Sequence, residues 1–207
     1  MKKFALFCAV LIMCTLFASC SGLVSLTDEG GKLVDKKNGI TYVMAPICYE
    51  PISTELEPFA ECASLKLQLF GIIGLDTDKW LSEQYEGIGG VYYNEAAVTL
   101  PTLTEFEPTQ IMICIEETIT TGLGAVVIPE DIDAVVDAFM NGEEAKLVQG
   151  GESYKLKFSS DKYEGIYYNL IYIEGDDGEN YIYDRATRHC VNVGDVLIKY
   201  LPRESAS

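Results

Sequence analysis

The sequence predicts an α+β fold built mainly from an antiparallel sheet rich in tyrosine, with one clear amphipathic helix and one or two short helices. Apolar and polar residues alternate with the period of a strand at several places along the chain. Only residues 129–141 carry apolar side chains at sustained helical spacing. Tyrosine, a good strand residue, occurs 13 times. We therefore expect a single globular domain over residues 39–201.

The N-terminus has the features of an export signal. Lys2 and Lys3 precede Phe4 to Ala18, which are apolar apart from Thr15. Fifteen such residues suit the apolar region of a signal peptide and fall short of the ~20 that a membrane-spanning helix needs.

The signal ends in Phe17-Ala18-Ser19-Cys20, which resembles the lipobox of bacterial lipoproteins. It departs from that family at Phe17, where leucine is usual. The resemblance implies that residues 1–19 are removed and that Cys20 is lipidated, for example with palmitate. It also implies that the protein is anchored to the cell membrane and exposed at the cell surface, outside the cytoplasm. An ordinary secretory signal and an uncleaved anchor are the alternatives. Residues 20–38 read as the lipidated cysteine and a tether, because they lack sustained periodicity.

The first half of the domain is expected to hold short strands, one loop and one short helix. Residues 47–64 contain two prolines and several acids, which favours a loop with a helical turn after Pro58. Residues 76–84 fit a short helix capped by Asp or Thr. The expected strands are 39–46, 65–69, 87–94 and 111–115.

The clearest element is the helix at about 129–141. Pro129 suits its first position, and Glu130, Asp131 and Asp133 suit the positive end of the helix dipole. Gly142 supplies a C-terminal stop. The apolar stripe consists of Ile132, Val135, Val136, Phe139 and Met140.

The rest of the chain reads as a sheet. Residues 165–174 are apolar on both faces, which is typical of a central strand, and the Gly-Asp-Asp-Gly turn at 175–178 joins them to a partner at 181–185. Further strands are expected at 154–158 and 189–193. Residues 196–201 fit a strand or a helix, and 202–207 are expected to fray.

Charge excludes one class of partner. The chain has a net charge of −17, and removal of the signal with Lys2 and Lys3 leaves 13 basic against 32 acidic side chains, a net charge of −19. Such a surface repels phosphate backbones, so we expect no nucleic-acid binding.

Residues for covalent, redox or metal chemistry are scarce. The mature chain keeps Cys48, Cys62, Cys114 and Cys190, which would form two disulfides or stay as buried thiols. No C-x-x-C motif occurs, and His189 is the only histidine, so we predict no catalytic residue, no metal site and no cofactor. The glycines at 87–90 and 122–124 do not complete a phosphate loop.

Tyrosines offer the one candidate binding face. Tyr167, Tyr168, Tyr181 and Tyr183 fall in expected strands, where exposed rings would stack on a sugar or peptide and buried rings would fill a core. The resulting hypothesis is a non-catalytic lipoprotein, anchored through its N-terminal lipid, that binds an extracellular glycan, peptide or protein or has a structural role in the envelope. The alternative is an extracellular glycan hydrolase that uses paired carboxylates.

Overall fold

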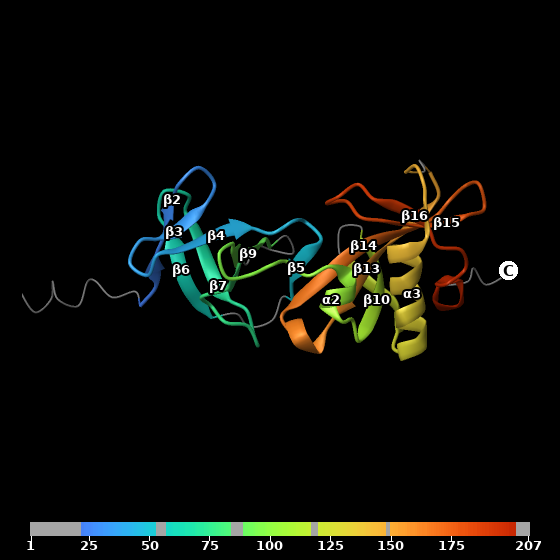
Figure 1. Ribbon diagram of the computed structural model, residues 1–207, viewed down its shortest axis with the longest axis horizontal. Coiled ribbons are helices and arrows are strands. Elements are labelled where there is room, and N and C mark those ends of the chain that lie inside the picture. The colour runs from blue at the N-terminus through green and yellow to red at the C-terminus, as the bar shows by residue number, and fades with distance from the viewer. Residues whose placement is uncertain (1–21, 53–56, 84–88, 117–119, 148–149, 202–207) are drawn as a thin grey trace, which may run out of the picture.

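The chain forms two eight-stranded sheets that lie side by side along the long axis of the molecule (Figure 1). The computed structural model describes residues 22–52, 57–83, 89–116, 120–147 and 150–201. The expected signal at residues 1–19, Cys20 and the C-terminal residues 202–207 lie outside these ranges. Within them only two α-helices occur, and only one is longer than a single turn. The protein is therefore sheet-rich, with less helix than a balanced α+β fold.

The first sheet closes on itself. β1 (Val24–Ser25) and β2 (Thr27–Asp28) flank Leu26, and they pair with opposite ends of the sheet: β1 with β6 (Pro58–Cys62) and β2 with β3 (Leu33–Asp35). We call this the closed sheet. The remaining strands are β4 (Ile40–Met44), β7 (Leu67–Gly71), β8 (Trp80–Glu83) and β9 (Val91–Asn94). Its interior is filled by Leu26, Leu33, Tyr42, Ala60, Cys62, Leu69, Leu81 and Tyr92.

Two expectations for the N-terminal third are wrong. Residues 24–35, which lie in the expected tether, form β1 to β3, and Leu26 and Leu33 are buried there. Strands of two or three residues are too short for alternation to show. Pro58 begins strand β6 rather than a helical turn, and its register with β7 is irregular at that point.

The helix expected at 76–84 is also absent. Asp76 accepts a hydrogen bond from the backbone N–H of Asp78, which makes a turn, and β8 follows. Trp80 and Leu81 are both buried, and Leu81 belongs to the interior of the closed sheet. Burial on both faces of a strand outweighs the weak local preference for helix.

The second sheet, which we call the open sheet, contains the predicted central strand. β14 (Ile166–Glu174) pairs along one edge with β13 (Glu152–Ser159). Its other edge is shared, because β5 (Tyr49–Pro51) pairs with residues 166–168 and β15 (Asn180–Tyr183) with residues 171–174. The other strands are β10 (Gln110–Glu116), β11 (Thr120–Val126), β12 (Glu143–Glu144) and β16 (Cys190–Asn192).

The helix predicted at 129–141 is confirmed as α3 (Pro129–Asn141). Ile132, Val135 and Phe139 are buried against the open sheet, whereas Met140, expected in the same stripe, is 42% exposed. The helix α2 (Leu103–Phe106) is held by a capping box between Thr102 and Glu105. Two 3-10 turns, Asp161–Tyr163 and Ile198–Tyr200, complete the elements.

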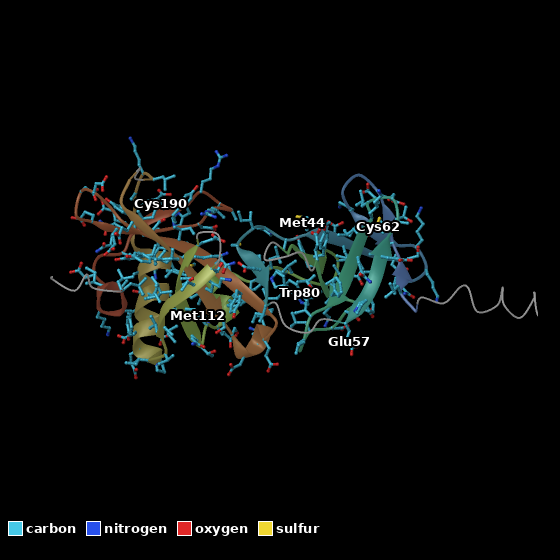
Figure 2. All side chains as sticks on the ribbon, turned by 180° about the vertical axis from the view of Figure 1, so that it is seen from behind. Met44, Glu57, Cys62, Trp80, Met112 and Cys190 are labelled. Atoms are coloured by element: carbon cyan, nitrogen blue, oxygen red, sulfur yellow. The ribbon has the colours of Figure 1, made fainter. Side chains whose placement is uncertain are left out.

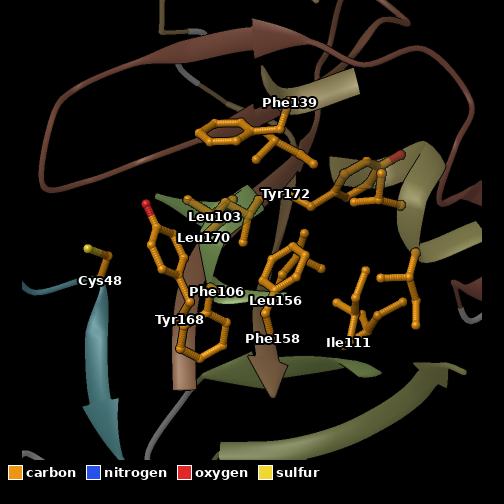
Figure 3. Packing of buried hydrophobic residues seen from close by; sticks show 14 of the residues in the cluster. Cys48, Leu103, Phe106, Ile111, Phe139, Leu156, Phe158, Tyr168, Leu170 and Tyr172 are labelled. Carbon is orange, nitrogen blue, oxygen red and sulfur yellow. The ribbon is translucent and has the colours of Figure 1, made fainter. Parts of the chain in front are cut away.

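One hydrophobic core joins the two sheets. Leu156, Leu170 and Tyr172 of the open sheet pack under α3 (Figure 3), and the same cluster includes Trp80 and Val91 from the closed sheet. The Trp80 ring meets the Tyr163 ring edge-on, with centroids 6.1 Å apart. The two sheets are therefore parts of one packed unit.

Candidate functional site

A cavity of about 570 Å³ lies between the two sheets, where β14 changes partner from β5 to β15. At this point Asn169 still donates its backbone N–H to the Cys48 carbonyl, at 2.7 Å. The wall from the closed sheet is formed by Met44, Ala45, Glu83, Gly89 and Gly90. The connecting segment adds Ile47, Cys48, Tyr49 and Glu50, and the open sheet adds Glu116, Lys155, Asn169, Leu170, Ile171 and Arg185. We call it the inter-sheet cavity.

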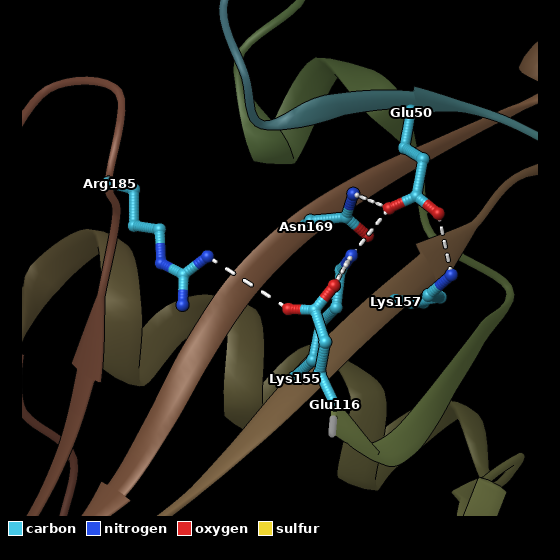
Figure 4. Close-up of polar contacts among 6 residues, drawn as sticks. All are labelled: Glu50, Glu116, Lys155, Lys157, Asn169 and Arg185. Atoms are coloured by element: carbon cyan, nitrogen blue, oxygen red, sulfur yellow. Dashed lines mark hydrogen bonds and ion pairs between the residues drawn. The ribbon is translucent and has the colours of Figure 1, made fainter. Parts of the chain in front are cut away.

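Glu50 anchors a polar cluster on the floor of this cavity (Figure 4). One carboxylate oxygen lies 2.7 Å from Lys157 Nζ. The other lies 2.7 Å from Lys155 Nζ and accepts a hydrogen bond of 2.8 Å from Asn169 Nδ2. The two lysine side chains are only 13% and 11% exposed. The cluster joins β5 to β13 and β14 across more than a hundred residues of sequence.

Strand geometry explains why these groups meet. Tyr154, Leu156 and Phe158 of β13 are buried in the core beneath α3, so the alternating Lys155 and Lys157 point to the opposite face. Lys157 pairs with Asn169 across the strands, which places Asn169 on the same face. The amide oxygen of Asn169 is buried and has no hydrogen-bond partner among the described atoms. A donor from a ligand or from water would complete it.

The cluster holds its charges. Burial by itself raises the pKa of Glu50, but hydrogen bonds and positive charge from Lys155 and Lys157 outweigh it and leave the pKa below its usual value. Burial lowers the pKa of Lys155, and the hydrogen bond and charge of Glu50 overturn that effect and raise it. Glu50 and Lys155 are therefore an ion pair at neutral pH.

A second, looser pair forms part of the cavity wall. Glu116 lies 3.1 Å from Lys155 Nζ, and the Arg185 guanidinium lies 3.9 Å from the other Glu116 oxygen. The side chains of Glu116 and Arg185 are 41% and 55% exposed. Arg185 is thus only weakly engaged and remains accessible from the cavity.

The candidate tyrosines do not form a common exposed face. Tyr167, Tyr181 and Tyr183 share the cavity-side face of the open sheet by register, but Tyr168 points to the opposite face and is buried against Tyr49 and Phe106. Tyr181 is also buried, and Tyr167 lies under the Lys157 ammonium. None of the tyrosines that the structure describes is exposed. Their rings mainly fill the core.

Cysteine and histidine positions offer no nucleophile in the described residues. Cys48, Cys62, Cys114 and Cys190 are buried free thiols. Burial raises the pKa of Cys48, which lines the cavity, to about 12. His189 packs edge-on against Phe139 and is not among the cavity-lining residues. No group of three or more His, Cys, Asp or Glu side chains converges within the described ranges as a metal site.

Two glycines, Gly89 and Gly90, line the cavity. A Cβ at Gly89 would come within 2.1 Å of the Glu83 carbonyl oxygen, so only glycine fits there. A Cβ at Gly90 would lie 3.5 Å from Glu83 Oε2 and from Met44 Cε, which is ordinary contact. Gly122 and Gly124 flank a register shift where β11 pairs with β10. Residues 87 and 88 lie outside the described ranges.

Comparison with protein-family models, curated proteins and solved structures yields no match. In the part of the chain that the structure describes, no helix has the length and apolarity to cross a membrane.

The sequence indicated only part of this site. Lys155 and Lys157 occupy alternate positions of one expected strand, which indicates a charged face of the sheet. Such a pair stands out because the chain has only 15 basic residues against 32 acidic ones. Glu50 lay in an expected loop, and nothing local linked it to Lys155 or Asn169. Arg185 was the last residue of an expected strand, and no sequence feature around it indicated a place in a site.

Proposed function

We propose that this chain is an exported, lipid-anchored envelope protein that binds a small extracellular ligand in the inter-sheet cavity and catalyses no reaction. The observation that carries the proposal is the cavity itself, with a buried, fully charged polar cluster on its floor. Its volume of about 570 Å³ falls among those of small-molecule sites. Its walls combine apolar side chains such as Met44, Ile47 and Ile171 with a few polar groups, which is the usual composition of such sites.

The charge state of Glu50 favours binding over hydrolysis. A glycosidase acid must hold a proton near neutral pH, which requires a raised pKa. The pKa of Glu50 is lowered, because two lysines stabilise its ionised form. Both Glu50 and Glu116 are occupied by Lys155, so neither is free to act as a nucleophile or base. Glu50 is therefore unsuited to supply the acid that the hydrolase alternative requires.

Membrane attachment through Cys20 has a geometric consequence. Strand β1 begins at Val24, and a four-residue step spans at most about 14 Å when fully extended. A lipid on Cys20 would then hold the closed sheet close to the bilayer. The negative charge of the chain opposes contact with anionic headgroups, so the covalent lipid has to supply the attachment.

The anchor is tested by changing Cys20 to Ala in the full chain and expressing it in a bacterial host. The wild-type protein should fractionate with membranes and carry the added mass of acyl chains. The Cys20→Ala protein should lose both. A Cys20→Ala chain that stays with membranes at the mass of the wild type would overturn the anchor.

Ligand binding is tested with soluble residues 22–207 labelled with nitrogen-15. Small neutral, cationic, anionic and zwitterionic amides and sugars are titrated while amide resonances are followed. At least one probe should shift resonances of residues 45–50 and 169–171 together. If every probe leaves these resonances unmoved, the cavity is not a ligand site and the binding proposal fails.

A further inference from the structure

The inter-sheet cavity is lined by side chains of both charges. Among the cavity-lining residues from the closed sheet, only Glu83 is charged. On the opposite side, Glu50 and Glu116 pair with Lys155 and Arg185, so the lining charges of that wall balance and Arg185 is its accessible cation. The cavity is therefore a dipolar site within a strongly acidic protein.

Of the charged residues that line the cavity, Arg185 and Glu83 are free to bind a ligand. Glu50 and the two lysines satisfy one another at 2.7 Å and are mostly buried. Arg185 makes one long contact of 3.9 Å and is half exposed. Glu83 forms no ion pair with any described basic side chain, and its carboxylate lies beside Gly90 and Met44. One accessible cation and one accessible anion thus face the same space from different sheets.

Resting on the binding function proposed above, we propose that the ligand is a small apolar zwitterion of the amino-acid or short-peptide class. Its carboxylate binds Arg185, its ammonium binds Glu83, and its side chains contact Met44 and Ile47. Met44 and Ile47 are 56% and 64% exposed at the cavity, so a ligand would remove apolar surface from water.

The same charges disfavour the other ligand classes. A simple anion meets Glu83 and Glu116, and a simple cation meets Arg185 and Lys155, so either would desolvate a like charge without a counter-charge. A neutral sugar uses neither free charge. Sugars also bind well on exposed aromatic rings, and the one aromatic residue among those lining the cavity, Tyr49, is 7% exposed.

Four versions of one dipeptide separate these classes. Calorimetry and amide resonances of residues 22–207 are measured with leucyl-leucine, its N-acetyl form, its C-terminal amide, and the doubly capped form. These carry both charges, only the negative charge, only the positive charge, and none. Leucyl-leucine should bind about tenfold more tightly than either singly capped form, because each removes one charge-assisted hydrogen bond.

Two variants assign the charges to residues. Glu83→Gln should weaken the binding of leucyl-leucine about tenfold and leave the binding of the N-acetyl form unchanged. Arg185→Gln should also weaken the binding of leucyl-leucine about tenfold, but it should leave the binding of the C-terminal amide unchanged. Glu61→Gln and Arg188→Gln make the same charge changes on exposed residues that do not line the cavity and should have no effect. Circular dichroism verifies that each variant is folded.

The outcomes distinguish the two proposals. Binding of a capped form as tight as that of leucyl-leucine, or equal effects of Glu83→Gln and Glu61→Gln, would overturn the zwitterion and leave a binding cavity. If neither the four dipeptides nor any compound of the wider panel shifts the resonances of the cavity residues, the binding function itself is overturned.

Discussion

Glu50 shows how one residue can set both the stability and the character of a site. Its carboxylate receives Lys155, Lys157 and Asn169 from two neighbouring strands. A buried ion pair contributes little net stability compared with an apolar substitute, but removal of one partner leaves the others uncompensated. Lys157 would then lose its carboxylate partner, and Lys155 would keep only the half-exposed Glu116. The cluster is therefore more sensitive to loss of Glu50 than to loss of an exposed acid.

Replacement of Glu50 by Gln should lower the free energy of unfolding by about 3 kcal/mol, since two largely buried ammonium groups lose the carboxylate that they share. Glu116→Gln is the matched control, because it removes a 41% exposed carboxylate that also contacts Lys155. Its cost should stay below about 1 kcal/mol. Urea unfolding measures both values, and equal costs would contradict the buried character of the Glu50 cluster.

The same residue predicts a pH dependence. Because the pKa of Glu50 is below its usual 4.5 in the folded protein, its stabilisation is complete above about pH 4.5 and is lost as the pH falls through the lower, folded value. The stability difference between wild type and Glu50→Gln should therefore shrink on acidification below pH 4.5. A difference that stays constant from pH 7 to pH 3 would show that folding does not lower the pKa of Glu50.

Elements differed in how far local sequence could predict them. The helix α3 was predicted at its observed bounds because five apolar residues at helical spacing, an N-terminal proline and acids in the first turn all agree. Strands β1, β2 and β3 have two or three residues each, so only pairing with distant strands defines them. The sequence did not predict strand β5, and this strand matters most for the site because it brings Glu50 to β14. Its pairing partner lies more than a hundred residues away and leaves no local periodicity.

Gly142 was predicted as the helix stop, but its structural reason is different. Its φ is −70°, outside the left-handed region that favours glycine. A Cβ there would lie 2.3 Å from the Ala138 carbonyl oxygen and 2.5 Å from a methyl group of Val191. Glycine is required by this close approach of α3 to β16.

A Gly142→Ala change should accordingly destabilise the protein by about 2 kcal/mol through overpacking. Gly122→Ala is the control, because nothing lies within 4 Å of a Cβ at Gly122 and its effect should be below about 0.5 kcal/mol. Thermal or urea unfolding tests the pair. If Gly142→Ala is as stable as Gly122→Ala, the close approach is not a constraint.

At the scale of the whole molecule, the two sheets should unfold together. Trp80, the single tryptophan of the chain, is 5% exposed in the core shared by both sheets. Its fluorescence should report the same urea midpoint as far-UV circular dichroism, which reports all strands. Two separate midpoints would show that the closed and open sheets are independent.

A side chain that fills the inter-sheet cavity should block the proposed binding site. In Gly90→Val the new side chain would start at ordinary contact distance from Glu83 and Met44 and extend into the cavity. Gly122→Val adds the same atoms at an open position outside it. Calorimetry with whichever probe of the panel binds wild-type protein should show at least about tenfold weaker binding for Gly90→Val and unchanged binding for Gly122→Val. Wild-type affinity in a folded Gly90→Val protein would show that the ligand binds outside the inter-sheet cavity.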